Sequence, residues 1–242
     1  MCGRYSLTTP VEALRALFGF PERPNLAPRA NIAPTQDVAA LRLGAAGDGG
    51  ETGGGAEPGR RFVWLRWGLI PAWAKDLAIG NRLINARAEG VAEKPAFRAA
   101  FRKRRCLILA DGFYEWRKEA GRRQPYRITL PEGGPFAFAG LWERWTAPPG
   151  GPAAAERIES CTIITTEANA LLRPLHNRMP VILDPAALAA WLDPETPPDE
   201  ARALLRPDPG AAMTLYRVSP RINDAANDDP ALIAPIEAPE AP

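Results

Sequence analysis

The chain has little of the residues from which metal sites and disulfide frameworks are built. Its 242 residues include three cysteines, Cys2, Cys106 and Cys161, and one histidine, His176. The cysteines form no C-x-x-C pair and their number is odd, which argues against a disulfide framework and against a zinc site. We therefore expect no metal and no cofactor, and a reducing compartment suits three unpaired thiols.

The sequence also lacks a long apolar run. No window approaches the roughly 18 consecutive apolar residues that a membrane span requires, and the first residues, which include Arg4, have no apolar segment typical of a signal peptide. The net charge of +2 is too small to indicate nucleic-acid binding by itself. We expect a cytoplasmic monomer, nucleoid-associated if the source is bacterial, with no membrane partner.

Short strand-like runs with few helical patterns between them make up most of the chain. β-Branched and aromatic residues are enriched in segments such as 37–43 and 106–116, which Gly, Pro or polar residues separate. Helical patterns cover residues 9–20, with Thr9 as the expected N-cap, and residues 167–175. The predicted fold class is α+β: a single domain with a curved, largely antiparallel, barrel-like mixed β-sheet flanked by short helices.

Composition divides the chain into one domain and a tail. Residues 1–227 carry the strand and helix patterns, whereas residues 228–242 are acidic and proline-rich and are predicted to be disordered. Two stretches rich in Gly or in Pro and Gly, near residues 44–60 and 147–157, are interpreted as loop insertions. The first is not a phosphate-binding loop, because no G-K-[ST] follows its glycines.

Cys2 is a candidate nucleophile of an unusual kind. Removal of Met1 would leave a thiol next to a free α-amine, with reference pKa values of about 8.5 and about 8. Such an amine forms an imine with an aldehyde, and the adjacent sulfur closes that imine into a five-membered thiazolidine. The alternative is that Cys2 is only a small second residue that permits methionine removal.

Two further residues are candidates for proton transfer. Glu115 lies between Tyr114 and Trp116, where desolvation would raise its pKa into the range of a general acid or base. His176 lies in the turn sequence HNRM, where functional groups are often displayed. The alternatives are an ordinary glutamate at a strand end and an ordinary surface histidine.

Polar and aromatic residues suggest a nucleic-acid surface. Asn85, Arg87 and Glu89 alternate along INARAEG, so an extended backbone would point all three to one face, where they could bind a phosphate and a sugar. Trp67 belongs to the tryptophan-rich stretch WLRWGLIPAWAKD, and rings beside cations are typical of single-strand grooves. A basic run covers residues 98–105. Solvated strand or helix faces and core tryptophans remain the alternatives.

Taken together, the motifs resemble the SRAP family of abasic-site processing proteins. The resemblance rests on MCGRY, NIAPTQ, WGLIPAWAKD, NARAE, GFYEW, HNRMP and VSPRIN, which occur in that order between residues 1 and 223. It implies that Cys2 forms a thiazolidine crosslink with the ring-opened sugar of an abasic site in single-stranded DNA and so shields the lesion. Glu115 would be the acid and base, His176 would assist ring opening or reversal, and Asn85 would orient the reacting groups.

The resemblance also implies how the DNA is held. Arg4 and Arg87 would bind phosphates beside the lesion, and Pro34 and Trp67 would act as wedges against neighbouring bases. The family is implied to remove its own Met1 with the help of Glu115, and thus to combine peptidase-like self-processing with lyase-like activity in the SOS response and DNA repair. The expected partner is single-stranded DNA that contains abasic sites.

Two other functions remain open at this stage. Glutamine amidotransferases with an N-terminal nucleophile also begin with M-C-G and use the thiol on an amide carbonyl, with the α-amine as base. A non-covalent single-stranded DNA-binding module would need only the basic run and the tryptophans. Glutaminase activity would identify the first, and binding that protein denaturation abolishes would identify the second.

Overall fold

The computed structural model describes residues 2–44, 59–119, 121–148, 156–210 and 213–237. Its strands are β1 Tyr5–Leu7, β2 Arg29–Ile32, β3 Asp37–Leu43, β4 Arg60–Trp67, β5 Asn85–Arg87, β6 Arg105–Ala110, β7 Gly112–Glu119, β8 Arg122–Thr129, β9 Phe136–Thr146, β10 Arg157–Glu167, β11 Arg178–Pro180 and β12 Thr214–Arg217. Its α-helices are α1 Val11–Phe18, α2 Arg98–Lys103, α3 Leu188–Leu192 and α4 Pro198–Ala203. Most of the two predicted loop insertions lies outside the described residues.

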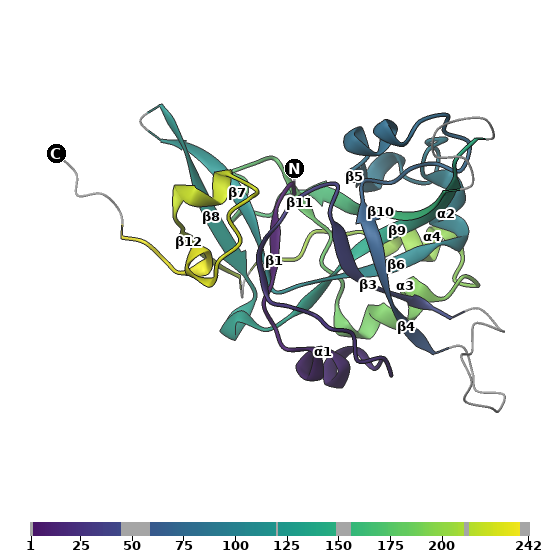
Figure 1. Cartoon of the computed structure of the whole chain (residues 1–242), viewed down its shortest axis with the longest axis horizontal. Coiled ribbons are helices and arrows are strands. Elements are labelled where there is room, and N and C mark those ends of the chain that lie inside the picture. The colour runs from purple at the N-terminus through teal and green to yellow at the C-terminus, as the bar shows by residue number, and fades with distance from the viewer. Residues whose placement is uncertain (1, 45–58, 120, 149–155, 211–212, 238–242) are drawn as a thin grey trace.

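Five strands close into a mixed barrel. They pair in the order β10, β4, β3, β6 and β9, and β9 pairs with β10 to complete the ring. Among the pairs of this ring, only β4–β10 is parallel. The two short strands β5 and β11 both pair with the last residues of β10. This arrangement confirms the predicted barrel-like, largely antiparallel α+β domain (Figure 1).

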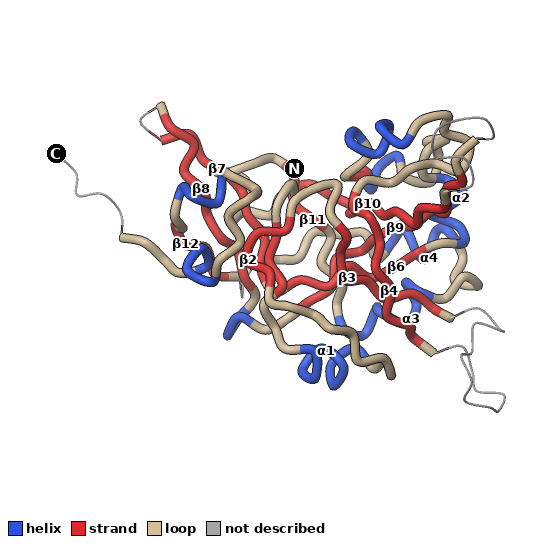
Figure 2. The backbone as a smooth tube through the Cα atoms, in the orientation of Figure 1, coloured by secondary structure: helices blue, strands red, loops and turns tan. Residues whose placement is uncertain are grey.

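The other five strands form a separate antiparallel sheet in the order β12, β8, β7, β1 and β2. β6 and β7 are consecutive in the chain but belong to different sheets, as the tube in Figure 2 shows. Asp111 lies at the change of sheet, where its carboxylate accepts hydrogen bonds from Ser6 and Thr8. The predicted single strand over residues 106–116 was therefore wrong, because these buried donors hold the chain at a corner.

Apolar side chains from the strands fill the interior. Leu41, Leu107, Phe138 and Ile163 are fully buried within one cluster. Trp191 of α3 packs against the barrel and donates from its indole nitrogen to the Cys106 carbonyl at 2.9 Å. Among the described residues, no helix has both the length and the apolar character that a membrane crossing requires.

Two helix predictions need correction. The first helix begins at Val11, and the Thr9 hydroxyl donates to Asp111 instead of capping the helix. Residues 167–175 do not form a helix: Glu167 ends β10, and residues 170–175 form turns. Pro174 has no N–H and restricts the residue before it, while the Asn169 side chain accepts from the Leu172 N–H at 3.0 Å.

The C-terminal segment is ordered further than its composition indicated. Asp228 forms an ion pair with Arg29 and accepts from the Asn31 N–H at 2.8 Å. A 3-10 turn follows at Pro230–Ile233, with Leu232 fully buried. The prediction of disorder from residue 228 was therefore wrong up to residue 237, because Asp228 and Leu232 attach this segment to the sheet; residues 238–242 lie outside the described ranges.

Candidate active site

Cys2 lies just before β1, next to the middle of β7. Tyr5 is paired with Phe113 across these antiparallel strands, and the Tyr114 N–H donates to the Arg4 carbonyl at 3.0 Å. Continuing this register places the backbone of Gly3 opposite Glu115. The sheet thus brings the start of the chain beside the carboxylate of GFYEW, two features more than a hundred residues apart in the sequence.

Asn85 contacts Cys2 from the barrel side. Its amide nitrogen donates to the Cys2 carbonyl at 2.8 Å, and β5 is held in place by its parallel pairing with β10. The amide oxygen of Asn85 is buried and has no hydrogen-bond partner among the residues that the structure describes. A buried acceptor without a partner is costly, so this atom is available to an N–H or O–H group that enters the site.

Burial shifts the acidity of both groups that could react. Glu115 is 4% exposed, and its burial raises the pKa to about 7. Burial also raises the pKa of the Cys2 thiol, and the negative charge of Glu115 raises it further. Near neutral pH the carboxyl group is therefore present in both protonation states, while the thiol keeps its proton.

His176 lies in the turn before β11, which pairs with β10 close to the β5–β10 pairing. Its Nδ1 accepts from the Arg178 N–H at 3.0 Å, which leaves the ring proton of neutral His176 on Nε2. Partial burial lowers the pKa of His176. The ring is therefore neutral at pH 7 and can donate from Nε2.

Arg178 is a residue that the sequence analysis did not select, although HNRMP contains it. Its guanidinium forms two hydrogen bonds with Glu89, at 2.5 and 3.0 Å, and also contacts the Thr165 carbonyl. These bonds tie the NARAE segment to the HNRMP segment. Arg87 is exposed and lines a cavity of about 350 Å³ together with Arg173, Arg178 and one carboxylate, Glu167. Arg178 is paired with Glu89, so Arg87 and Arg173 are the arginines of this lining that suit a phosphate.

Arg4 directly precedes β1, and Pro34 follows β2, which pairs with β1. The half-buried Arg4 guanidinium donates to the Asn31 side chain at 2.8 Å and to the Ile222 carbonyl at 2.7 Å, and burial lowers its pKa. Arg4 therefore holds the C-terminal segment in place in addition to any phosphate contact. Pro34 is half-buried and precedes Thr35, whose φ of 72° is costly for a β-branched residue.

Trp67 does not occupy the position expected of a base wedge. Its ring is fully buried, packs edge-on against Tyr5 with centroids 5.3 Å apart, and donates to the Ile84 carbonyl at 2.9 Å. The prediction that Trp67 contacts bases was therefore wrong for this conformation, because the ring is part of the core. Trp73, 62% exposed, and Trp64, 46% exposed, are the accessible tryptophans of the same stretch.

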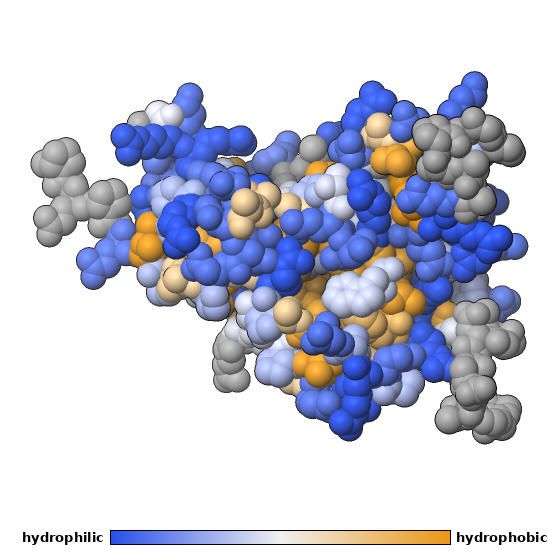
Figure 3. All heavy atoms as spheres, in the orientation of Figure 1, coloured by the Kyte–Doolittle hydropathy of each residue, from blue (hydrophilic) through white to orange (hydrophobic). Residues whose placement is uncertain are grey.

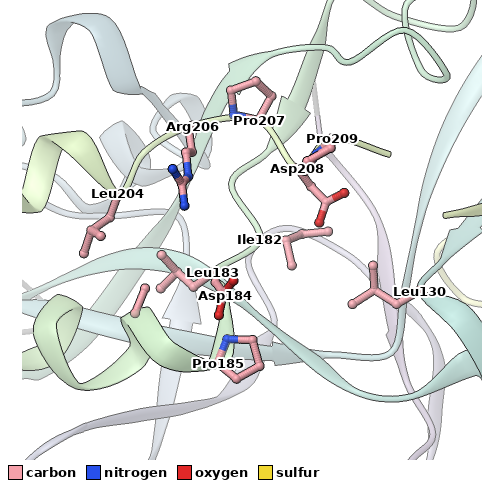
Figure 4. Close-up of a pocket in the computed structure, with 11 residues that line it drawn as sticks. Leu130, Ile182, Leu183, Asp184, Pro185, Leu204, Arg206, Pro207, Asp208 and Pro209 are labelled. Atoms are coloured by element: carbon pink, nitrogen blue, oxygen red, sulfur yellow. The ribbon is translucent and has the colours of Figure 1, made fainter. Parts of the chain in front are cut away.

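The structure thus brings Cys2, Asn85 and Glu115 together. Arg87 ends β5 and His176 lies in the turn before β11, and both of these strands pair with β10. A separate cavity of about 460 Å³, lined by residues of the 182–187 and 204–209 segments, contains none of the predicted site residues (Figure 4). The candidate active site is therefore the region around Cys2.

Comparisons with known proteins identify relatives of the whole domain. The family model described as SOS response associated peptidase (SRAP) matches residues 1–225. The abasic site processing protein YoqW of Bacillus subtilis is 47% identical over 171 residues, which are 70% of this chain and 74% of that protein. HMCES of Gallus gallus, also called an abasic site processing protein, is 34% identical over 72% of this chain and 57% of its own length.

Solved structures share the fold over nearly the whole chain. A crystal structure of a protein from Bacteroides thetaiotaomicron has a TM-score of 0.83 at 25% identity and covers 98% of this chain and 100% of its own. A second, from Bordetella bronchiseptica, has a TM-score of 0.71 at 29% identity, with 90% of this chain and all of the other covered.

Proposed function

Because the chain belongs to the SOS response associated peptidase (SRAP) family, we propose that it processes abasic sites in single-stranded DNA by forming a covalent thiazolidine crosslink through Cys2. The observation that carries the proposal is the position of Cys2, whose carbonyl accepts from Asn85 and whose thiol lies within the electrostatic influence of Glu115. The relatives named abasic site processing proteins support the choice of substrate. Cys2 is buried, so capture requires this site to open.

The reaction follows from the acidities in the site. The α-amine of Cys2 adds to the aldehyde carbon of the ring-opened sugar, and the carbinolamine loses one water to give an imine. The thiol then adds its sulfur to the imine carbon, and its proton passes to the nitrogen. Glu115, with a pKa of about 7, takes the proton from the amine and returns one to the departing oxygen.

His176 suits the step that precedes this addition. An abasic sugar is mostly a closed hemiacetal, so a proton must reach the ring oxygen before an aldehyde exists. The Arg178 N–H occupies Nδ1 of His176, which leaves Nε2 as the atom that moves the proton. The exposed Arg87, beside Asn85 on β5, would hold a phosphate next to the lesion.

We expect Met1 to be absent from the mature protein. The thiazolidine needs a free α-amine on Cys2, and self-processing that involves Glu115 would supply it. The intact mass of purified protein measures this directly. In the Glu115→Gln variant, Met1 should remain if the protein removes the residue itself. A protein that retains Met1 and still forms the adduct would overturn the ring chemistry.

Replacing His176 by alanine should slow both formation and reversal of the adduct. A group that catalyses ring opening also catalyses the reverse step, so each rate should fall by about tenfold or more, and the adduct should persist longer. Capture rates, and release rates in a chase with excess unlabelled abasic DNA, report the two steps. Wild-type rates in both directions would show that His176 is an ordinary turn histidine.

A further inference from the structure

The hairpin of β7 and β8 projects past the start of β1, at the upper left of Figure 1. Between this hairpin and the segment after β12 lies a groove with a volume of about 780 Å³. We call it the hairpin groove, and its lining residues are Glu119, Arg122, Arg123, Gln124, Arg217, Pro220 and Asn223. None of the catalytic steps above uses it.

The hairpin groove carries positive charge that the protein does not neutralise. Arg122 and Arg123 are exposed, and neither forms an ion pair with another residue that the structure describes. The one carboxylate in the lining, Glu119, is occupied by a hydrogen bond from Tyr126 and an ion pair with Arg217 at 2.8 Å. Figure 3 shows hydrophilic side chains over this projecting part of the molecule.

The hairpin groove is continuous with the candidate active site. Asn223 accepts from the Trp116 indole nitrogen at 2.7 Å through its side chain and from Arg4 at 3.1 Å through its carbonyl. Trp116 is the residue after Glu115, and the positive charge of Arg123 acts on the pKa of Glu115. The cavity that contains Arg87 adjoins Asn85, on the barrel side of Cys2. The two hollows are therefore lined by different elements. The Arg87 cavity belongs to the β5 and β10–β11 region that reaches Cys2 through Asn85, and the hairpin groove belongs to the β7–β8 hairpin and the segment after β12, beside Glu115 and Arg4.

We propose that the hairpin groove binds the phosphates of the single strand that continues from the abasic nucleotide, so that bound DNA runs from the Arg87 cavity past Cys2 and along the hairpin. This inference rests on the proposed function. Guanidinium groups pair with phosphate oxygens in fork geometry, and such contacts fix the path of a strand without reading its bases. Because the hairpin lies on one side of Cys2, the groove binds the DNA on one side of the abasic nucleotide only, either the 5′ flank or the 3′ flank.

The test uses oligonucleotides with a tetrahydrofuran analogue of the abasic site, which bind without reacting. One series keeps the 5′ flank short and lengthens the 3′ flank, and a second series does the reverse. Fluorescence anisotropy gives the affinity of wild-type protein, of the Arg122→Ala/Arg123→Ala variant and of a matched control, Arg157→Ala/Arg206→Ala, which removes two exposed arginines that line neither the Arg87 cavity nor the hairpin groove. Melting temperatures verify that each variant is folded.

For wild-type protein we expect affinity to rise with flank length in one series only. The Arg122→Ala/Arg123→Ala variant should lose this rise, by about tenfold or more at moderate salt, and its salt dependence should weaken by a slope of about 1.4 for two lost phosphate contacts. The Arg157→Ala/Arg206→Ala control should behave as wild type. A variant that keeps the length dependence, or a wild-type protein that shows none, would overturn the assignment of the groove.

A second readout separates this inference from the proposed function. Short oligonucleotides with a true abasic site should crosslink to the single variant Arg122→Ala at the wild-type rate, because Cys2, Asn85 and Glu115 are unchanged and Arg123, whose charge acts on Glu115, is kept. If wild-type protein itself fails to crosslink, the proposed function is wrong. If short DNA crosslinks normally and the flank effect is missing, only the groove assignment is wrong.

Discussion

The Cys2→Ala variant should form no adduct that survives denaturation, while its affinity for single-stranded DNA stays close to that of wild type. Alanine at this position keeps the α-amine after Met1 is removed but cannot close the sulfur ring. The amine should therefore still form an imine, which is reversible and is trapped only by borohydride reduction. A denaturing gel with a labelled abasic oligonucleotide, run with and without borohydride, measures both properties.

Two other variants make this result specific. Cys106→Ala changes a fully buried thiol in the barrel and should leave crosslinking intact. Cys2→Ser should resemble Cys2→Ala, because a hydroxyl adds to an imine much less readily than a thiol. A stable adduct in Cys2→Ala without reductant would place the bond on another residue and exclude the thiazolidine.

The Glu115→Gln variant should capture abasic DNA about a hundredfold more slowly or worse, within the range typical of a lost general acid and base. The wild-type rate should change with an apparent pKa near 7, the value to which burial raises Glu115. Glutamine does not titrate, so this inflection should disappear from the profile. Glu12→Gln, which changes an exposed carboxylate on α1, is the matched control and should leave the profile unchanged.

Glu115→Gln should also change the pH dependence of the melting temperature of the protein without DNA. The pKa of Glu115 is higher in the folded protein than the ordinary 4.5, so the folded state holds this proton more tightly than the unfolded state. Stability from this group is therefore lost as pH rises from about 4.5 to about 7. Glu115→Gln should melt higher than wild type at pH 8, and this advantage should shrink at pH 5. An equal difference at both values would contradict the burial argument.

The sequence was most informative where a pattern is local. The mostly apolar run at residues 37–43 predicted β3 at its observed limits, and four successive residues of this strand are buried. Residues 167–175 were predicted as a helix from their composition. A helix does not form there, because Pro174 has no N–H to donate and the Asn169 side chain forms hydrogen bonds with the Leu172 N–H and the Asp208 carbonyl. The bond to Asp208 exists only in the folded protein, so the sequence pattern could not reveal it.

The site was only partly predictable for a similar reason. Cys2, Asn85 and Glu115 were selected for their chemistry and their motifs, and the fold brings them together. Trp67 was chosen as an aromatic residue beside cations, but whether a ring faces DNA or the core depends on the closure of the barrel. In the sequence, nothing distinguishes Arg178 or the arginines of the hairpin groove from other surface arginines. Arg178 reaches the site through the pairing of β5 and β11 with β10, and the groove arginines are brought together by the pairing of β7 with β8.

The intact mass of the trapped complex tests the central claim most directly. Wild-type protein is incubated with an oligonucleotide that carries one abasic site, denatured without reductant and analysed by mass spectrometry, with fragmentation to locate the bond. The account predicts the mass of protein without Met1 plus the oligonucleotide minus one water, with the DNA attached at Cys2. A complex that retains Met1, a bond at a lysine, or the absence of any adduct would contradict it.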